Sequence, residues 1–367
     1  MKEEQKRDSS PAVCEKICTY ENKREEFINP GVSYRGKPFW AWNGKLKREE
    51  LIRQIDILEE MGFGGFFMHS RVGLETEYLG EEWFALTNAC ADYGEEKGMQ
   101  AWLYDEDRWP SGTAGGLATM DEAYRASFLK MEAIGSEQFT PELWMENPVA
   151  VFTCIRNGCC YRNARRLAKG ELPGAGETVL TFTVTPAQCR EVYNGYTYLD
   201  TMNKEAVEHF IQLTHEAYAA HCGGRTGSKI RGIFTDEPHR GTVFSEFSGG
   251  CTYALPYTPA LFAEFQKRFG YSLTDYLPDL FLLKEGQKLA KVKWDYMELC
   301  QQLFLENYAI PIHKWCGEHQ MLFTGHVLHE DSLTAQTMMQ GSLMRFYEYM
   351  DIPGVDVLFE DNAAGGS

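Results

Sequence analysis

The sequence predicts an α/β protein built on a (β/α)8 barrel of the TIM type, of which about six strands are present. Short, almost wholly apolar runs alternate with amphipathic helical segments along much of the chain. This alternation is typical of a parallel sheet with helices on its faces. The runs end in Trp, His, Arg, Asp or Glu, which favours a barrel with one functional rim over an open sheet that binds at a single switch point.

Three strand–helix units make up the first part of the predicted barrel. Gly62 and Gly98 each follow a helical pattern, at the position where glycine commonly ends a helix. The second strand is apolar until it reaches His69, as expected for a strand that is buried on both faces. The strands expected here span residues 37–44, 64–71 and 99–107, and the helices span 47–61, 81–97 and 121–131.

The regular pattern is interrupted after the third unit. Asn157-Gly158 and the loop 173–176 separate short strand-like runs, which indicates a small antiparallel insertion. Asn203 then caps a helix that continues to about His221 and leads back to the barrel. The runs in the insertion span 149–155, 161–167 and 178–184, the later barrel strands 230–237, 321–330 and 354–361, and the later helices 259–269, 291–318 and 341–350.

These patterns predict a polar lead-in over residues 1–30, strands 1–3 of the barrel over 31–135, the insertion over 136–198 and strands 4–6 over 199–367. The last two strands of an eight-stranded barrel would then be missing. Such a barrel would have unpaired edges on its first and sixth strands. We therefore expect either a longer natural protein or a partner that closes the gap.

Composition limits the classes of partner. The sequence has 367 residues and a formal net charge of −17, from 36 basic and 53 acidic residues. This charge argues against nucleic acid or an anionic membrane as a partner and suits a neutral polar ligand. Eleven cysteines without zinc-like spacing fit a reducing cytoplasm. The N-terminus lacks the apolar region of a secretory signal, and no apolar run is long enough to span a bilayer, so we expect a cytoplasmic location.

The residues at the predicted strand ends suit a carbohydrate. Aromatic rings stack on the apolar faces of sugars, while carboxylate, imidazole, guanidinium and amide groups bind hydroxyls. The sequence therefore predicts an oligosaccharide or glycoside as the substrate, and it leaves the oligomeric state open. The candidate substrate-binding residues are Trp40, Trp42, Asn43, His69, Arg71, Asp105, Glu106, Trp109, Asp236, His326 and His329.

Two glutamates are the candidate catalytic residues. The strand at 230–237 ends in Asp236-Glu237, and Pro238 then removes a backbone donor and stops it. Glycoside hydrolysis needs one protonated carboxyl group, which assists departure of the leaving oxygen, and one ionised group, which acts as base or nucleophile. Glu237 and Glu330 are the expected pair because they lie on consecutive strands of the predicted barrel. Glu106 is the reserve candidate.

Each candidate also has a structural interpretation. Asp236 could cap a turn, Trp40 and Trp42 could belong to the core, and the acidic run 105–107 could be a charged loop. His69 could orient a neighbour, and Arg71 could pair with an acid. A metal site from His69, His326, His329 and Asp236 is a further alternative, although the sequence contains neither an HxH nor an HExxH pattern.

Five segments together resemble glycoside hydrolase family 106, the α-L-rhamnosidase-type enzymes and their bacterial relatives. They are FWAWNGKL at 39–46, GFGGFFMHSRVGL at 62–74, WLYDEDRWPSGTAGG at 102–116, YLDTMNKEAVEHFIQLTHEAY at 198–218 and FTDEP at 234–238. The resemblance implies a (β/α)8 catalytic domain with further β-rich domains, inversion by paired glutamates and an association with calcium. It also implies that Glu237 in FTDEP is the general acid, with Glu330 in GHVLHE as a candidate base. Compared with this pattern, we expect the chain to end before the last two strands of the barrel.

The expected function is therefore an exo-acting, inverting glycosidase that removes a terminal deoxy-sugar or a similar residue. Inversion predicts carboxyl groups about 6.5–9.5 Å apart, against about 5 Å for retention. A catalytically inactive carbohydrate-binding barrel fragment is the first alternative. A metal-dependent barrel hydrolase is the second.

Overall fold

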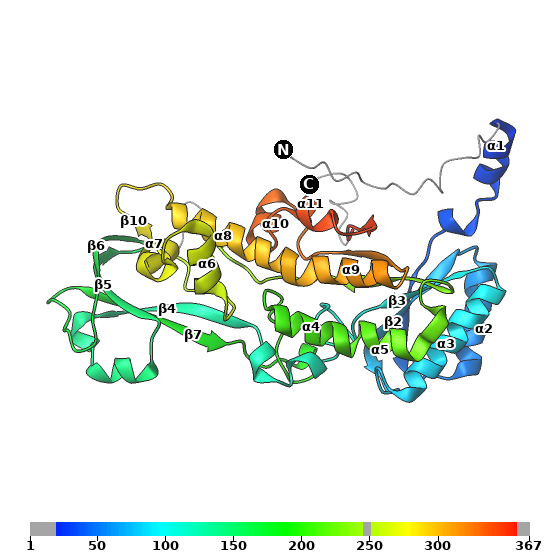
Figure 1. Ribbon diagram of the computed structural model, residues 1–367, viewed down its shortest axis with the longest axis horizontal. Helices are drawn as coiled ribbons and strands as arrows, with labels where there is room; N and C mark the ends of the chain where they lie inside the picture. Colours follow the sequence, from blue (N-terminus) through cyan, green and yellow to red (C-terminus); the bar gives the residue numbers. More distant parts are fainter. Residues whose placement is uncertain (1–19, 245–250, 358–367) are drawn as a thin grey trace, which may run out of the picture.

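Two six-stranded β-sheets lie toward opposite ends of an elongated molecule (Figure 1). The computed structural model describes residues 20–244 and 251–357. One sheet is parallel throughout and carries the candidate site at the carboxyl ends of its strands. The other sheet is mixed and curled.

The parallel sheet contains the first five predicted strands in the predicted order. Each neighbouring pair is parallel, and β8 lies between β3 and β11 in the interior of the sheet. The strands are, in sheet order, β1 (Phe39–Gly44), β2 (Gly65–Leu74), β3 (Gln100–Tyr104), β8 (Ile230–Asp236), β11 (Leu322–His326) and β12 (Ile352–Pro353).

Helices pack against one face of this sheet and bury its large side chains. Trp40 and Trp42 of β1 point to this face, where Trp42 contacts Trp83 of α3. A Cβ atom on Gly94 of α3 would lie 3.0 Å from the ring of Phe66, so glycine permits close packing of helix on strand. The helices nearest this sheet are α2 (Arg48–Glu60), α3 (Glu81–Glu96), α5 (His215–Cys222) and α9 (Ile310–Glu318).

The predicted (β/α)8 barrel is wrong. The parallel sheet is open, with β1 and β12 as its edges, and β12 has only two residues. The sixth strand was predicted at 354–361, but residues 354–357 form no strand and 358–361 lie outside the described residues. Alternating strands and helices specify parallel pairing, whereas closure requires pairing between the first and last strands, which no local pattern encodes.

The second sheet is larger than the predicted insertion. The helix predicted at 121–131 is wrong, because residues 127–135 form β4 and pair with β7 along all nine residues. The sheet also takes in β9 and β10 from later in the chain, so the domain limits at 136 and 198 stay a prediction. In sheet order its strands are β10 (Leu283–Lys284), β6 (Cys160–Arg166), β5 (Ala150–Asn157), β7 (Thr178–Pro186), β4 (Ser127–Gly135) and β9 (Ala254–Tyr257).

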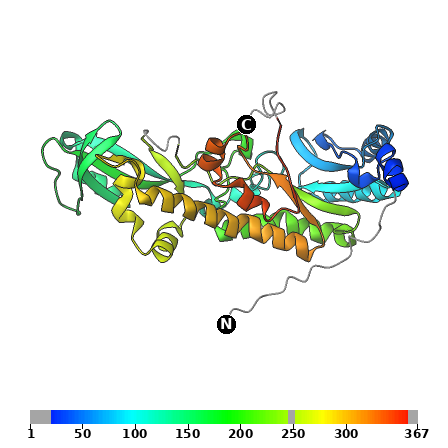
Figure 2. The ribbon, with the colours of Figure 1, turned by 90° about the horizontal axis from the view of Figure 1, so that it is seen from above.

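A long helical run connects the two ends of the molecule (Figure 2). It consists of α8 (Lys291–Phe304), a π-helical turn (Leu305–Ala309) and α9. Tyr308 in the π-helical turn is buried between Phe210 and Phe346. The remaining α-helices are α1 (Tyr20–Ile28), α4 (Lys204–Leu213), α6 (Leu261–Phe269), α7 (Leu277–Phe281), α10 (Leu333–Met339) and α11 (Leu343–Tyr347).

The helix predicted from Asn203 to His221 is divided into α4 and α5. Asn203 caps α4 as expected, since its side chain accepts a hydrogen bond from the backbone N–H of Glu205. Thr214 separates the two helices, and its hydroxyl donates to the carbonyl of Phe210 at 2.8 Å. Such a bond back to the preceding turn bends or interrupts a helix.

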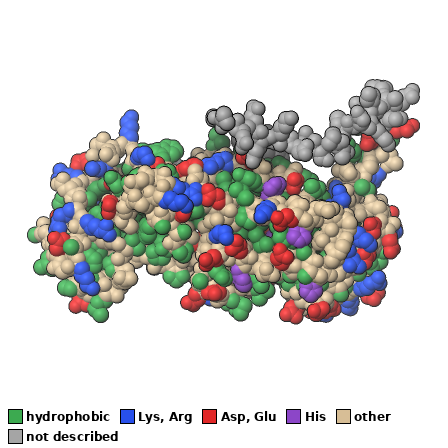
Figure 3. All heavy atoms as spheres, viewed as in Figure 1, with side chains coloured by type: hydrophobic (Ala, Val, Ile, Leu, Met, Phe, Trp, Pro, Cys, Tyr) green, Lys and Arg blue, Asp and Glu red, His purple; other side chains and the backbone are tan. Residues whose placement is uncertain are grey.

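The surface carries both signs of charge. On the face seen in Figure 3, Lys and Arg side chains are interspersed with Asp and Glu rather than gathered into one basic stripe. None of the described helices is long and apolar enough to cross a membrane.

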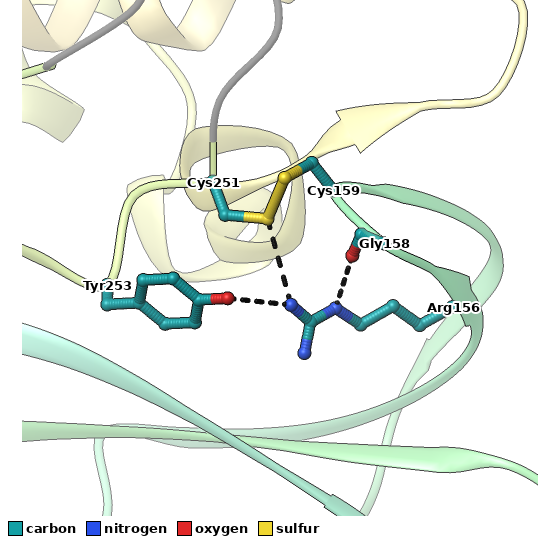
Figure 4. Close-up of a disulfide and its surroundings, with 5 residues drawn as sticks. All are labelled: Arg156, Gly158, Cys159, Cys251 and Tyr253. Carbon is teal, nitrogen blue, oxygen red and sulfur yellow. Dashed lines mark hydrogen bonds between the residues drawn. A yellow bond between two sulfur atoms is a disulfide. The ribbon is translucent and has the colours of Figure 1, made fainter.

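A disulfide joins two distant parts of the second sheet (Figure 4). Cys159, just before β6, is bonded to Cys251, just before β9, across a sequence separation of 92 residues. Arg156 lies beside it and donates to the hydroxyl of Tyr253 at 3.0 Å. Disulfides persist in oxidising compartments, so this bond lends no support to the expected reducing cytoplasm.

We expect loss of this disulfide to destabilise the protein. Closing a loop of this length restricts the unfolded chain, and the chain-entropy model gives a stabilisation of about 4.6 kcal/mol. Cys159→Ser should lower the free energy of unfolding by an amount of that order, measured by chemical denaturation without reductant. The control is Cys160→Ser, which changes the adjacent exposed and unbonded cysteine. Equal unfolding midpoints for the two variants would contradict the expectation.

Candidate active site

A buried histidine contacts three carboxylates at the carboxyl ends of β8 and β11. The parallel register places Asp236 beside His326. The Nε2 of His326 lies 3.0 Å from Oδ1 of Asp236, and its Nδ1 lies 2.8 Å from Oε1 of Glu330. The same Nδ1 is 3.8 Å from Oε1 of Glu237. The structure therefore brings together both predicted catalytic glutamates and two of the predicted binding residues.

The charges of this cluster follow from its contacts. Burial alone would lower the pKa of His326, but hydrogen bonds to Asp236 and Glu330 raise it to about 10. Burial would raise the pKa values of both carboxyls, yet each remains below its ordinary value. Hydrogen bonds from His326 and Tyr104 act on Asp236, and those from His326 and the backbone N–H of Asp356 act on Glu330. At neutral pH the cluster thus contains an imidazolium and two carboxylates.

Glu237 differs from its neighbours. Burial, with smaller contributions from the charges of Asp236 and Glu330, raises the pKa of Glu237 to about 7. His326 and a hydrogen bond from Nε1 of Trp109 to Oε2 of Glu237 oppose this shift. A substantial fraction of Glu237 therefore keeps its proton near neutral pH.

The backbone of Glu237 explains how two consecutive residues reach the same histidine. Neighbouring residues of a regular strand point to opposite faces of the sheet. Glu237 has a φ of +48°, in the left-handed region, and its N–H donates to the carbonyl of His326 at 3.0 Å. This departure from the extended conformation at the end of β8 allows both Asp236 and Glu237 to approach His326.

The last residue of β3 and the loop that follows it support the cluster through hydrogen bonds. The hydroxyl of Tyr104 donates to Oδ2 of Asp236 at 2.6 Å. Asp105 is fully buried, which raises its pKa well above the ordinary value, and it accepts a hydrogen bond from the hydroxyl of Ser111. The Ser111 hydroxyl in turn accepts from the backbone N–H of Asp236 at 2.7 Å. Asp105 is therefore linked to the end of β8 through the hydroxyl of Ser111.

Glu106, predicted as a binding residue and as the reserve candidate for the catalytic pair, is held by the backbone of its own loop. Its buried carboxylate accepts hydrogen bonds from five backbone N–H groups and one hydroxyl of the loop that follows it. Burial raises its pKa to about 7, and several of these hydrogen bonds oppose that shift. The donors are the backbone N–H groups of Asp107, Gly112, Thr113, Ala114 and Gly115, and the hydroxyl of Thr113.

Two predicted aromatic residues lie away from the cluster. Trp40 and Trp42 are buried on the helix-facing side, where Nε1 of Trp40 donates to Gln54 of α2 at 2.6 Å. They belong to the core, so their prediction as sugar-stacking residues is wrong. Trp109 remains available, because it bonds Glu237 and is 39% exposed.

The other predicted binding residues differ in their exposure to solvent and in their distance from the cluster. Asn43 and Arg71 are exposed near the ends of their strands. His329 is half exposed and lies 3.8 Å from Asp331, outside the cluster. His69 is buried against the ring of Tyr104, and burial lowers its pKa to about 3, so it is neutral. Among the described residues, neither of its ring nitrogens has a hydrogen-bond partner.

Sequence reasoning missed three residues of this region. Phe39 is 48% exposed and contacts the rings of His69 and Phe234, on the face of β1 opposite the tryptophans. Tyr104 directly precedes the acidic run, and its bond to Asp236 has no sequence signature. Asp356 comes from the segment after β12. The alternation of side chains along β1 was the signal that could have identified Phe39.

The alternative metal site of His69, His326, His329 and Asp236 is not assembled in the structure. Among the described residues, the one set of three side chains with potential ligand atoms within 4.8 Å of one another is Glu237, His326 and Asp356. Both nitrogens of His326 are committed to carboxylates, and an imidazolium has no lone pair to offer a metal. Calcium takes six to eight oxygen ligands, which two carboxylates do not provide. These residues therefore do not fit the calcium that the family resemblance implies.

Comparison with known proteins shows a likeness of fold. No family model and no curated protein matches this sequence. Among solved structures, a rhamnosidase from Novosphingobium sp. PP1Y superposes with a TM-score of 0.56 and 11% sequence identity. The match covers 89% of this chain and 48% of the rhamnosidase, so this chain spans about half the length of that protein.

We expect the charge on His326 to make stability depend on pH. Its folded pKa of about 10 lies above the unfolded value of about 6.5. The stabilisation is therefore complete below about pH 6.5 and is lost as the pH rises toward 10, at up to about 1.4 kcal/mol per pH unit. Denaturation measured between about pH 7.5 and 8.5 should show this slope for the wild type.

His326→Gln should remove most of that slope. The matched control is His329→Gln, which changes an exposed histidine on the same segment and should preserve the slope. A wild-type stability that is flat across this interval would contradict the imidazolium.

Proposed function

We propose that the chain is a glycoside hydrolase in which Glu237 acts as the general acid. The observation that carries the proposal is a carboxyl group with a pKa of about 7 beside two ionised carboxylates at one strand-end cluster. A pair of carboxyl groups with separated pKa values is the arrangement that glycoside hydrolysis uses. The fold shared with a rhamnosidase supports the same class of reaction by analogy.

The neighbours of Glu237 suit the transfer of its proton. The indole N–H of Trp109 holds Oε2, so the orientation of the carboxyl group is set before the leaving oxygen is protonated. After transfer, Glu237 is an anion 3.8 Å from the imidazolium of His326, which stabilises the new charge. The exposed rings of Trp109 and Phe39 provide apolar surfaces for a sugar.

The second carboxylate has two candidates. Glu330 is ionised, but its side chain is 7% exposed and Oε1 is bonded to His326 and to the backbone N–H of Asp356. Glu330 and Glu237 also approach the imidazole at the same nitrogen, Nδ1 of His326, and Glu330 is the nearer of the two, at 2.8 Å against 3.8 Å. This geometry favours Glu330 as a residue that positions His326. Asp356, with a carboxylate oxygen within 4.8 Å of Glu237, is the other candidate.

The stereochemistry of the product distinguishes the candidates. Inversion, implied by the family resemblance, requires carboxyl groups about 6.5–9.5 Å apart, and retention requires about 5–5.5 Å. The separation between Glu237 and Asp356 is closer to that of retaining enzymes. An inverted anomer, detected by NMR during hydrolysis, would therefore argue against Asp356.

We expect Glu237→Gln to lower kcat by about 10²- to 10⁴-fold on glycosides with poor leaving groups, because general acid catalysis is lost. Aryl glycosides with good leaving groups should be less affected. Since only protonated Glu237 can donate, wild-type kcat should fall as the pH rises through about 7. Glu60→Gln, at the exposed end of α2, is the control. Equal, negligible rates for wild type and Glu237→Gln, with retained sugar binding, would instead indicate a non-catalytic carbohydrate-binding protein.

We expect Trp109→Phe to shift the alkaline limb of the pH–rate profile upward. The indole hydrogen bond lowers the pKa of Glu237, so its removal should raise that pKa and keep the acid protonated to higher pH. Trp144→Phe is the matched control, because among the described residues the indole N–H of Trp144 has no partner. An unchanged limb for Trp109→Phe would rule out Glu237 as the group that sets it.

A further inference from the structure

A cavity of about 510 Å³ lies where the second sheet approaches the segment after β8. The ends of β4 and β7 form one side, residues 198–202 form another, and His239 with its neighbours forms a third. A volume of this size suits a small ligand of one or two rings. None of the predicted site residues lines this cavity, so it is distinct from the carboxylate cluster.

The lining of the cavity is cationic although the chain has a net charge of −17. Lys130, Arg190 and Arg240 contribute to it, and within the described part of the chain none of them forms an ion pair with a carboxylate. Asp200 is the one acid among the described residues of the lining, and burial raises its pKa to about 7. The walls therefore carry more positive than negative charge at neutral pH.

Arg240 is the most unusual of these residues. Its side chain is 4% exposed, and its Nε has no hydrogen-bond partner among the described residues. Within the described part of the chain, the other guanidinium nitrogens bond only the carbonyls of Gly241 at 3.3 Å and Thr337 at 3.4 Å. Arginine remains charged even when burial lowers its pKa, and a buried charge without a counterion is strongly unfavourable. An anion in the cavity would relieve this cost.

The remaining lining suits a sugar ring. Tyr193, Tyr198 and Tyr257 supply aromatic surface, and the ring of His239 stacks on Tyr198 with centroids 4.3 Å apart. The Nδ1 of His239 is buried and has no partner within the described residues. Burial lowers the pKa of His239 to about 4, so the neutral ring can hydrogen-bond a hydroxyl.

The cavity is tied to the proposed acid through the backbone. His239 follows Glu237 by two residues. The hydroxyl of Tyr198 accepts from the N–H of His239 at 3.3 Å and donates to the carbonyl of Ser111 at 2.7 Å. The hydroxyl of Ser111 binds the N–H of Asp236 at 2.7 Å. The position of the cavity relative to Glu237 is thus fixed by the residues that support the end of β8.

We propose that this cavity binds the carboxylate of an acidic sugar, carried by the part of the substrate beyond the bond that is cleaved. The carboxylate would accept hydrogen bonds from the guanidinium and ammonium groups, and the sugar ring would lie against the tyrosines. The position of this sugar in a substrate rests on the proposed function, whereas its binding in the cavity does not.

Direct binding tests the cavity without turnover. Titration calorimetry on the full chain carrying Glu237→Gln would use methyl β-D-glucuronide, methyl β-D-glucoside and inorganic sulfate as probes. We expect the glucuronide to bind at least about 10-fold more tightly than the glucoside, since a charge-assisted hydrogen bond is worth about 1.5–3 kcal/mol. Equal affinities for these two sugars would overturn the proposal. Sulfate binding as tightly as the glucuronide would overturn the assignment to an acidic sugar.

Variants locate the binding site. Lys130→Gln and Arg190→Gln should each weaken glucuronide binding by about 3- to 10-fold without affecting the glucoside. The matched control is Lys169→Gln, which removes the same charge from an exposed loop outside the cavity. Arg240→Gln should abolish the preference for the acidic sugar and Arg240→Lys should partly retain it. If Arg240→Gln does not fold, Lys130→Gln and Arg190→Gln still test the proposal, because these two residues lie nearer the surface. Unchanged binding in both of those variants would overturn the proposal.

The two proposals fail in different ways. Glucuronide binding that depends on Lys130 and Arg190, in a protein that hydrolyses no glycoside, would reject the hydrolase and leave the cavity assignment intact. Hydrolysis that depends on Glu237, in a protein that does not bind the glucuronide, would reject the cavity assignment alone.

Discussion

The charge on His326 is the constraint on which the candidate site depends. Three carboxylates contact one imidazole in a buried environment, and repulsion among them would be severe if all were ionised without a cation. The imidazolium compensates Asp236 and Glu330, which lie within hydrogen-bonding distance. Glu237 is farther away, at 3.8 Å, and receives the least of this compensation. It is therefore the carboxyl group that keeps its proton, and the chemistry proposed for it follows from its place in this order of contacts.

Much of the parallel sheet could be predicted because its signals are local. The apolar runs and the helices between them predicted the positions of the first five strands to within a few residues, and β8 and β11 are neighbours as expected. Closure into a barrel was not predictable, because it depends on pairing between strands at the two ends of the sheet. The strand at 127–135 was mistaken for a helix. Its identity depends on nine-residue pairing with β7, about fifty residues later, rather than on its own pattern.

The candidate site was predictable only in part. The acidic end of β8 and the histidine at the end of β11 could be recognised because charged residues at the ends of apolar strands are conspicuous. The direction of each side chain was harder to predict. Trp40 and Trp42 are two positions apart and so share the buried face, whereas Phe39 occupies the opposite one. The role of Glu106 depends on several backbone N–H groups that point toward its carboxylate. Nearly every residue type has such a group, so the sequence alone does not show where these groups point.

Two buried cations of this acidic protein differ in whether the chain itself supplies a counterion. This difference indicates which of the two sites needs a ligand to balance its charge. His326 is surrounded by carboxylates of its own chain, so its charge is already satisfied when the protein folds. Arg240 is buried to a similar extent, but among the described residues its guanidinium group donates hydrogen bonds only to carbonyl oxygens, at 3.3 and 3.4 Å. An uncompensated buried ion costs several kcal/mol, which is a large part of the net stability of a typical protein. An anion bound in the cavity would compensate the charge of Arg240. Its binding should therefore stabilise the folded protein, because the buried charge would then have a counterion.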